Sequence, residues 1–400
     1  MKKFLIILLV LLFPLSIFAQ TPGPDEGTSI EVTNEVNNSN ELGGNAKSAI
    51  LIDASTGNIL FEKNVHEKLA PASMTKMMSM LLVMEAIENK VINWNDIITV
   101  SENASGMGGS QILLETGEQM SVKDLFKGVA VASGNDAIVA LAEATYGTTD
   151  EFVSAMNKKA KELGLKDTNF KNVHGLDEEN HYSSAYDMSI IAKELVKHEK
   201  VLEFTSIYED YLRKGTDREF WLTNTNKLVR FLTGVDGLKT GYTPEAGFCL
   251  TATMKKNDMR LISVVMGEPS STVRNAETTS LLNYGFAQYK STTIVKKEQV
   301  ITEVELPKSE RLKIDVVPKE DVTILSKKTD ELGKIAYDVK LDDITIKTKV
   351  NDLVGSLIIK EDGKKIKTID LTIKNKIKRA SILTLYKRYL ENMIVGNINF

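Results

Sequence analysis

The chain has 400 residues, enough for two or three domains, and its 42% hydrophobic and 26% charged residues are typical of globular proteins. This composition excludes a wholly disordered chain, a collagen and a multi-span membrane protein. The net charge of −4 gives no electrostatic reason to expect nucleic acid as a partner. One cysteine, Cys249, excludes an intramolecular disulfide, and four histidines without a His-Glu-x-x-His pattern lead us to expect no metal and no cofactor.

The first residues predict export. A short basic start at Lys2 and Lys3 precedes an apolar run over residues 4–13, and Ala19 offers a small residue for cleavage. This pattern is typical of a secretory signal peptide over residues 1–19; the alternative is an uncleaved N-terminal anchor. Since export without disulfides fits a bacterial protein, we expect an exported bacterial chain.

The next residues predict a disordered spacer and then a large folded domain. Residues 20–45 are polar and poor in apolar side chains, which is typical of a disordered spacer. Two short apolar runs then flank Ser55-Thr56-Gly57-Asn58, a hairpin signal. Helices are expected at 74–87, 125–144 and 187–198, and paired strands at 248–253 and 261–266. Strands at both ends of a helical middle predict an α+β fold over residues 46–290.

A change of composition near Lys290 predicts a second domain. Short alternating segments rich in Val, Ile, Lys and Asp follow, among them 300–306 and 335–341. Asp362-Gly363 lies between two apolar runs, which is a hairpin-turn signal. We therefore expect a small all-β domain at 293–374.

The last segment, 376–400, predicts a basic amphipathic helix. Its apolar residues recur mostly at intervals of three and four and are interleaved with lysines and arginines; they include Ile377, Ala380, Ile382, Leu383, Tyr386, Tyr389, Leu390, Met393 and Ile394. No run approaches the roughly 20 apolar residues that a bilayer-spanning helix needs. We expect the helix to lie at a membrane surface, and the alternative is a helix that packs on the β domain or on a partner.

Ser73-Met74-Thr75-Lys76 is the first motif that indicates chemistry. Positions i and i+3 share a helix face, so the hydroxyl of Ser73 and the amine of Lys76 can meet. A serine hydroxyl needs a base to become a nucleophile. Lys76 can serve only when neutral, which requires its pKa to fall from about 10.4 to near 7, a bias of about 4–5 kcal/mol. Burial and a second nearby cation both favour the neutral form.

Two further motifs follow in order. Ser133-Gly134-Asn135 can supply a hydroxyl for proton relay and an amide that holds a substrate amide. Lys239-Thr240-Gly241 can place a cation and a hydroxyl on a strand edge, where Gly241 permits close approach of substrate backbone. Each motif alone is more simply a glycine turn; the three in this order indicate a catalytic site.

With these motifs the chain resembles the penicillin-recognising serine hydrolases. It is most similar to the low-molecular-mass penicillin-binding proteins that are D-alanyl-D-alanine carboxypeptidases. The matching stretches are 71–76, 133–137, 174–176, 182–185, 236–241 and 259–265. The resemblance is strong over residues 45–290, and implies a β-lactamase/transpeptidase-like domain with an antiparallel sheet and a helical cluster.

The resemblance also implies the reaction. Ser73 would attack the carbonyl between the two terminal D-alanines of a peptidoglycan stem peptide and form an acyl-enzyme. Lys76 would take its proton, and Ser133 would pass a proton to the leaving amine. Backbone amides of Ser73 and Tyr242 would form the oxyanion hole. β-Lactam antibiotics would act as inhibitors that bind covalently.

The remaining matched residues would bind substrate. Asn135 would hold the substrate backbone, and Lys239 would help to orient Ser133. Thr240 and Arg274 would bind the terminal carboxylate, for which a planar arginine is suited. The alternative for Arg274 is a surface arginine on a helix. His174 either lines the site or is a structural residue of a turn.

Three rival functions remain. A class A-like β-lactamase would need a second base in a Glu-x-x-Leu-Asn loop, and the stretch 219–224 comes close, but Asn224 stands one residue late. The second is a wall-binding scaffold with an inactive site, and the third is a zinc D,D-peptidase. We favour a serine D,D-carboxypeptidase held peripherally at the outer face of the bacterial cytoplasmic membrane.

Overall fold

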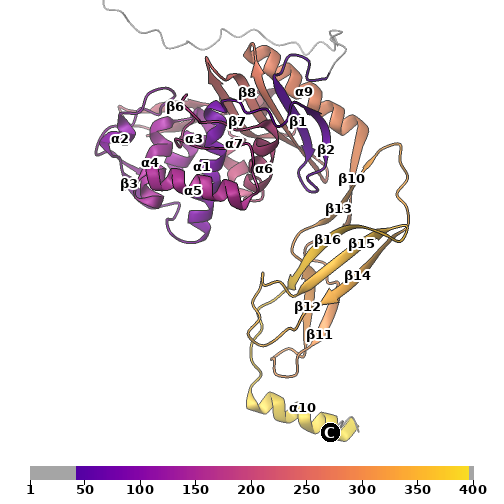
Figure 1. Ribbon diagram of the computed structural model, residues 1–400. Coiled ribbons are helices and arrows are strands. Elements are labelled where there is room, and N and C mark those ends of the chain that lie inside the picture. Colours follow the sequence, from indigo (N-terminus) through magenta and orange to yellow (C-terminus); the bar gives the residue numbers. More distant parts are fainter. Residues whose placement is uncertain (1–41, 396–400) are drawn as a thin grey trace, which may run out of the picture. The chain divides into compact units, whose positions relative to one another are not determined.

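The computed structural model describes residues 42–395 (Figure 1). The predicted signal peptide, 1–19, and most of the predicted spacer, 20–45, lie outside the described residues. The expected α+β architecture with a C-terminal all-β domain and a terminal helix is confirmed.

A five-stranded antiparallel sheet organises the first part of the chain, in the order β2-β1-β9-β8-β7. Its strands are β1 (Ser48–Asp53), β2 (Ile59–Lys63), β7 (Val235–Thr243), β8 (Gly247–Lys256) and β9 (Met259–Glu268). Strand β1 is buried on both faces: Ile50 and Ile52 pack into the helical core, whereas Ala49 and Leu51 pack with α9 (Ser271–Gln288). Figure 1 shows α9 on one face of this sheet and the helical cluster on the other.

Short helices and two hairpins form the helical side. A 3₁₀ turn, Ala72–Thr75, leads into α1 (Lys76–Glu88). The other helices are α2 (Glu102–Ser105), α3 (Val122–Ala132), α4 (Asn135–Tyr146), α5 (Thr149–Glu162), α6 (Ala185–Leu195), α7 (Lys200–Thr205) and α8 (Leu228–Phe231). The hairpins pair β3 (Ile97–Thr99) with β4 (Gln119–Ser121), and β5 (Glu209–Leu212) with β6 (Phe220–Thr223).

The single helix expected over 125–144 is wrong, because two helices, α3 and α4, occupy this stretch. Ser133 has a left-handed backbone with φ of 65°, which ends α3, and Gly134 precedes the first turn of α4. The unbroken apolar pattern across 125–144 hid this break. The expected strand pair over 248–266 and the hairpin over 49–61 are confirmed, with slightly longer strands.

The second part of the chain is all-β. A five-stranded sheet has the order β11-β12-β16-β15-β14, and β10 pairs with β13. The strands are β10 (Tyr289–Val295), β11 (Thr302–Glu305), β12 (Lys313–Pro318), β13 (Val322–Lys327), β14 (Ile335–Leu341), β15 (Gly355–Glu361) and β16 (Lys364–Ile373). Asp362 and Gly363 both have positive φ, as the predicted hairpin turn requires.

The terminal helix is shorter than expected. It runs as α10 (Ile382–Val395), and Ser381 caps its start by accepting from the amide of Thr384. Ile377 and Ala380, which we expected on the helix, are buried, and Ile377 packs in the core of the β domain. Within residues 42–395, no helix combines the length and apolarity that crossing a bilayer demands.

Candidate active site

The turn before α1 presents Ser73. Positions i and i+3 are eclipsed in a 3₁₀ turn, and the Nζ of Lys76 lies 3.0 Å from the Oγ of Ser73. Ala72, just before the serine, has φ of 46°, a conformation that costs an L-residue about 1–2 kcal/mol. Gly175 packs so closely on the backbone of Ala72 that a Cβ at this position would overlap its carbonyl. The tight contact between these two segments holds Ser73 at the surface of an otherwise buried turn.

Lys76 is fully buried, and its partners suit a neutral amine. Its Nζ donates to the Oδ1 of Asn135 at 2.6 Å and to the carbonyl of His174 at 2.8 Å. These two acceptors use both hydrogens of a neutral amine, which leaves its lone pair for the hydroxyl of Ser73. Burial, and next the charge of Lys239, lower the pKa of Lys76 well below its ordinary value, while Asp136 opposes them. The geometry and the charge environment both favour the base that the motif predicts.

The break between α3 and α4 brings Ser133 and Asn135 to this amine. Asn135 is buried at the start of α4, where its Nδ2 donates to the carbonyl of Gly108 at 2.7 Å. Ser133 is also buried, and its Oγ has no hydrogen-bond partner among the described residues. A buried hydroxyl without a partner is unfavourable unless another molecule supplies one. Ser133 is therefore available to a bound substrate.

Strand β7 forms the opposite wall. Lys239 is buried, and its Nζ donates to the carbonyl of Thr240, whose Oγ1 in turn donates to Thr225. Burial, and then the charge of Arg274, lower the pKa of Lys239 to about 7. Tyr242 is 55% exposed, and its ring lies 4.3 Å from that of Phe248.

Gly241 has a reason in the fold that we did not expect. A Cβ at Gly241 would lie 2.8 Å from the carbonyl of Pro71 and 3.1 Å from the Cβ of Ala72. The absent side chain therefore lets β7 pack on the turn that carries Ser73. This packing role is distinct from the close approach of substrate for which we expected the glycine.

Arg274 is buried on the first turn of α9, with 5% of its surface exposed, so the alternative of a surface arginine is wrong. Its guanidinium donates to the Oδ1 of Asn275, and its positive charge lowers the pKa of Lys239. Within residues 42–395, neither Lys239 nor Arg274 has a carboxylate partner. Two buried cations without an anion form a site suited to a carboxylate.

His174 takes part through its backbone. Its carbonyl accepts from Lys76, and its ring Nδ1 accepts from the amide of Leu176 at 3.2 Å. Burial, and then the charge of Lys76, lower the pKa of the imidazole to about 4, which keeps the ring neutral. The ring stabilises a turn, and the turn places a carbonyl on the catalytic amine.

Sequence reasoning missed His181. Its Nδ1 accepts from the amide of Lys171 at 3.0 Å, so the neutral ring carries its proton on Nε2 and donates to the Oγ1 of Thr75 at 2.8 Å. Thr75 lies between Ser73 and Lys76, so this bond braces the catalytic turn. No motif marked His181, because Thr75, the residue that it braces, lies 106 residues away in the sequence.

Glu219 makes its side-chain hydrogen bond within its own hairpin. Its side chain is exposed and accepts from the amide of Gly215 within the β5–β6 turn. Asn224 is buried instead, and its Nδ2 donates to the carbonyls of Thr205 and Ile207. In the described part of the chain, no group of three His, Cys, Asp or Glu side chains is arranged to hold a metal ion.

Comparison with known proteins places this geometry in a family. The family model described as D-alanyl-D-alanine carboxypeptidase, peptidase S11, matches residues 35–270, and the model of the penicillin-binding protein 5 C-terminal domain matches residues 289–379. The chain is 49% identical to D-alanyl-D-alanine carboxypeptidase DacF of Bacillus subtilis over 87% of this chain and 90% of the relative. It is 34% identical to DacC of Escherichia coli, over 84% and 85% of the two chains.

Solved structures of penicillin-binding proteins also match the fold of this chain. Penicillin-binding protein 5 of Haemophilus influenzae matches with a TM-score of 0.66 and 34% identity, over 84% of this chain and 98% of that one. Penicillin-binding protein D2 of Listeria monocytogenes in an ampicillin-bound form matches with a TM-score of 0.55 and 31% identity, over 60% and 98%. On these matches and on its Ser73–Lys76 pair, the chain belongs to the D-alanyl-D-alanine carboxypeptidases of peptidase family S11.

Proposed function

We propose that the chain removes the terminal D-alanine from peptidoglycan stem peptides through an acyl-enzyme on Ser73. The observation that carries this proposal is the buried amine of Lys76, 3.0 Å from the Ser73 hydroxyl and hydrogen-bonded to two carbonyl-type acceptors. A lysine in this setting can act as the general base, which typically contributes 10²–10⁴-fold in rate.

The proposed reaction has two halves. Lys76 takes the proton of Ser73 as its Oγ attacks the carbonyl of the penultimate D-alanine, and the backbone amides of Ser73 and Tyr242 stabilise the oxyanion. The C–N bond then breaks, a proton reaches the leaving amine through Ser133, and D-alanine departs. Water attacks the ester in the second half and regenerates Ser73.

Specificity for a chain end would come from the two buried cations. Lys239 and Arg274, with the hydroxyl of Thr240, offer a binding site for the terminal carboxylate of the substrate, and Asn135 holds the peptide backbone. β-Lactams carry a carboxylate next to a reactive amide, so the same site would bind them and Ser73 would be acylated. The ampicillin-bound and cefotaxime-bound forms of the Listeria protein support this part of the proposal.

Release of D-alanine from diacetyl-Lys-D-Ala-D-Ala tests the proposal. We expect the purified chain to release it in the presence of a chelator, and Ser73→Ala to lose at least 10³-fold in kcat/KM. Ser154→Ala, at an exposed serine on α5, is the matched control and should retain full activity. Loss of activity with chelator would favour a zinc peptidase, and an inactive wild-type chain would favour a scaffold.

We also propose that α10 binds a membrane surface. Ile382, Tyr386 and Tyr389 are 87%, 58% and 60% exposed and recur at intervals of four and three, so they form one apolar stripe beside Lys387. Such a helix is suited to the interface of an anionic bilayer. Arg388 points another way and donates to the carbonyls of Pro307, Ser309 and Glu310 in the β domain. The full chain should therefore sediment with phosphatidylglycerol vesicles, and a chain ending at Ser381 should remain in solution.

Export completes the proposal: we expect cleavage after Ala19 and a position at the outer face of the bacterial cytoplasmic membrane. The basic start and apolar run at the N-terminus support it. Mass measurement of the protein recovered from a bacterial host tests the cleavage. A mature chain that begins at Gln20 is expected, and a membrane-bound chain of full length would favour the uncleaved anchor.

A further inference from the structure

The loop between α2 and β4 positions the catalytic asparagine. The carbonyl of Gly108 accepts from the Nδ2 of Asn135 at 2.7 Å, and the carbonyl of Ser110 accepts from its backbone amide at 2.7 Å. Because the loop fixes the plane of this amide, it also fixes the direction of the Oδ1 that Lys76 contacts. Residues 107–118, which we call the 107–118 loop, contain no helix and enter β4 only after Glu118. Other groups must therefore hold the loop in place.

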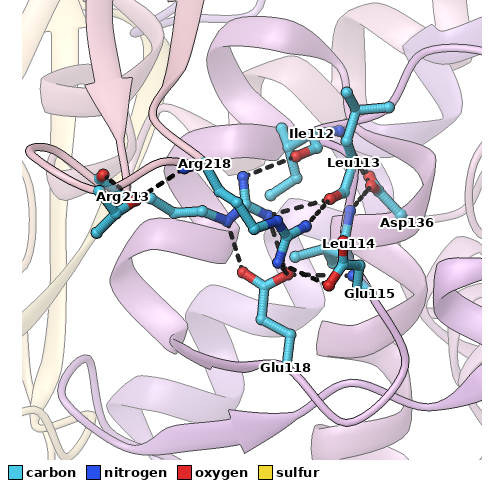
Figure 2. Close-up of polar contacts among 9 residues, drawn as sticks. Ile112, Leu113, Leu114, Glu115, Glu118, Asp136, Arg213 and Arg218 are labelled. Carbon is cyan, nitrogen blue, oxygen red and sulfur yellow. Dashed lines mark hydrogen bonds and ion pairs between the residues drawn. The ribbon is translucent and has the colours of Figure 1, made fainter.

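Asp136 holds the inner side of the loop. Its buried carboxylate accepts from the amides of Ile112 and Leu114, both at 3.0 Å (Figure 2). These bonds engage backbone N–H groups of the loop, whereas the carbonyls of Ile112 and Leu113 accept from other residues.

Two arginines of the β5–β6 hairpin hold the outer side. Arg213 donates to the carbonyl of Ile112 at 3.0 Å and to that of Leu113 at 3.3 Å, and Arg218 donates to the carbonyl of Leu113 at 2.9 Å. Figure 2 shows both guanidinium groups converging on the loop and on Glu118.

Glu118 fixes the guanidinium of Arg213. Its carboxylate accepts from the Nε at 2.6 Å and from Nη2 at 3.1 Å, and it also pairs with Arg218. Burial opposes the charge on Glu118, but the hydrogen bonds from Arg213 and its own backbone neighbours prevail and lower its pKa. The pair is 11% and 12% exposed, so solvent screens it little.

Leu113 has a strained backbone conformation that other contacts of the loop must maintain. Its φ is 56°, a left-handed conformation that is unfavourable for leucine, and its side chain is 57% exposed, so packing does not offset the strain. The hydrogen bonds that Asp136 accepts on one side and that the arginines donate on the other maintain this conformation.

We propose that Arg213, supported by Arg218 and Glu118, is a positioning residue for the peptidase reaction. It clamps the 107–118 loop against Asp136 and thereby orients the side-chain amide of Asn135 toward Lys76. This proposal rests on the proposed role of Asn135 and Lys76. It extends the active site to a hairpin that does not touch the reacting atoms.

A double-mutant cycle in the full chain tests it. Lysine keeps the charge of Arg213 but cannot reach two carbonyls and a carboxylate together, so Arg213→Lys should lower kcat/KM for D-alanine release about 10-fold. If Arg213 acts through Asn135, the same change in an Asn135→Ala background should lower kcat/KM less than 2-fold. Lys214→Met is the matched control, because Lys214 lies on the same hairpin but contacts Asp210 and the ring of Tyr211, which lie outside the 107–118 loop. It should retain the wild-type rate.

The outcomes are distinct. A 10-fold loss in both backgrounds means that Arg213 acts independently of Asn135 and overturns the proposal, as does an unchanged rate for Arg213→Lys. If that variant does not fold, Arg218→Lys takes its place with the same expectation for the Asn135→Ala background. An inactive wild-type chain would instead refute the function proposed above and this inference with it.

Discussion

At the scale of single residues, the proposed chemistry depends on Lys76, which is buried and has no carboxylate of residues 42–395 at hydrogen-bond distance. Its nearest polar partners are the amide of Asn135 and the carbonyl of His174, which accept hydrogen bonds without requiring a charged donor. Lys239 adds a second positive charge nearby. Each of these features favours the neutral amine, and because the proposed mechanism needs this form, we expect the rate to fall as the pH drops below the lowered pKa of Lys76.

Lys76→Arg tests the requirement for a neutral base. A guanidinium keeps the positive charge and the hydrogen-bond donors but does not deprotonate in proteins. We therefore expect kcat/KM for D-alanine release to fall by at least 10²-fold, and the melting temperature to fall as well, because the fully buried site disfavours a permanent cation. Lys68→Arg, an exposed site 4.0 Å from Asp167, is the control and should be fully active. A variant at position 76 that keeps a tenth of the activity would show that another group takes the proton.

A second buried group, Glu268 at the end of β9, makes stability depend on pH. It is 1% exposed, neither carboxyl oxygen has a hydrogen-bond donor among the described residues, and Glu277 lies close. Burial, and then this neighbouring carboxylate, raise its pKa to about 8. Since the folded state binds the proton more tightly than the unfolded state, stability is full below about pH 4.5 and falls as the pH rises to 8.

Glu268→Gln should remove this dependence. The amide stays neutral and can donate to Glu277, so the variant gains stability relative to wild type at pH 8 but not at pH 5. The largest gain is on the order of 4 kcal/mol, or several degrees in melting temperature. Melting temperatures of both proteins at the two pH values give the result. An equal difference in melting temperature between the two proteins at pH 5 and at pH 8 would show that the carboxyl of Glu268 is ionised in both the folded and the unfolded state.

Some site residues could be predicted from sequence, and others could not. Ser73 and Lys76 are three residues apart, so local geometry alone predicts their contact. The bond between Thr75 and His181 spans 106 residues, and that between Arg213 and Ile112 spans 101, so neither leaves a local pattern. Only the folded chain shows which distant partners brace the motif.

At the scale of elements, the site forms where β7 packs against the turn before α1. Gly241 lies at this contact, since any side chain there would meet the carbonyl of Pro71. The strand and the turn therefore approach closely enough for Lys239 to influence Lys76.

Gly241→Ala should separate β7 from this turn. The new Cβ would lie 2.8 Å from the backbone carbonyl of Pro71. We therefore expect kcat/KM to fall at least 10²-fold at a temperature where the variant is still folded. In contrast, Gly164→Ala places a Cβ in open space at φ of +72°, so it should lower the melting temperature slightly and leave the rate unchanged. Equal activity of Gly241→Ala and wild type would show that the turn can move without consequence.

The elements themselves were predictable where the pattern was long and regular. Strands β8 and β9 and the Asp362-Gly363 hairpin follow from apolar runs and turn residues. The division of residues 125–144 into two helices could not be predicted, because the left-handed backbone at Ser133 follows from tertiary contacts rather than from local propensity. The error fell at Ser133, a proposed catalytic residue, and local rules are often broken at functional sites.

At the scale of the whole chain, the boundary between the β domain and the terminal helix determines where the proposed membrane-binding segment can be removed. Ile377 is buried in the β domain, and the amides of residues 310 and 380 bond to carbonyls across this segment. The helix begins only at Ile382. Apolar periodicity joined the two segments in the sequence because buried positions and an exposed amphipathic face follow similar intervals.

Two truncations separate these roles. A chain that ends at Ser381 should leave phosphatidylglycerol vesicles yet keep the melting temperature of the β domain, because it retains Ile377 and Ala380. A chain that ends at Asn375 should also leave the vesicles but unfold at a lower temperature, with a loss of about 2–4 kcal/mol for the missing Ile377 side chain. Both should release D-alanine at the wild-type rate. Vesicle binding by either truncated chain would place the membrane contact elsewhere.

Mass spectrometry after brief incubation with benzylpenicillin tests the central claim most directly, because it identifies the residue that is acylated. We expect one penicilloyl group per wild-type chain, on the peptide that contains Ser73, and none with Ser73→Ala or, over the same time, with Lys76→Arg. An adduct on another residue, or rapid acylation of the Lys76→Arg variant, would contradict the mechanism.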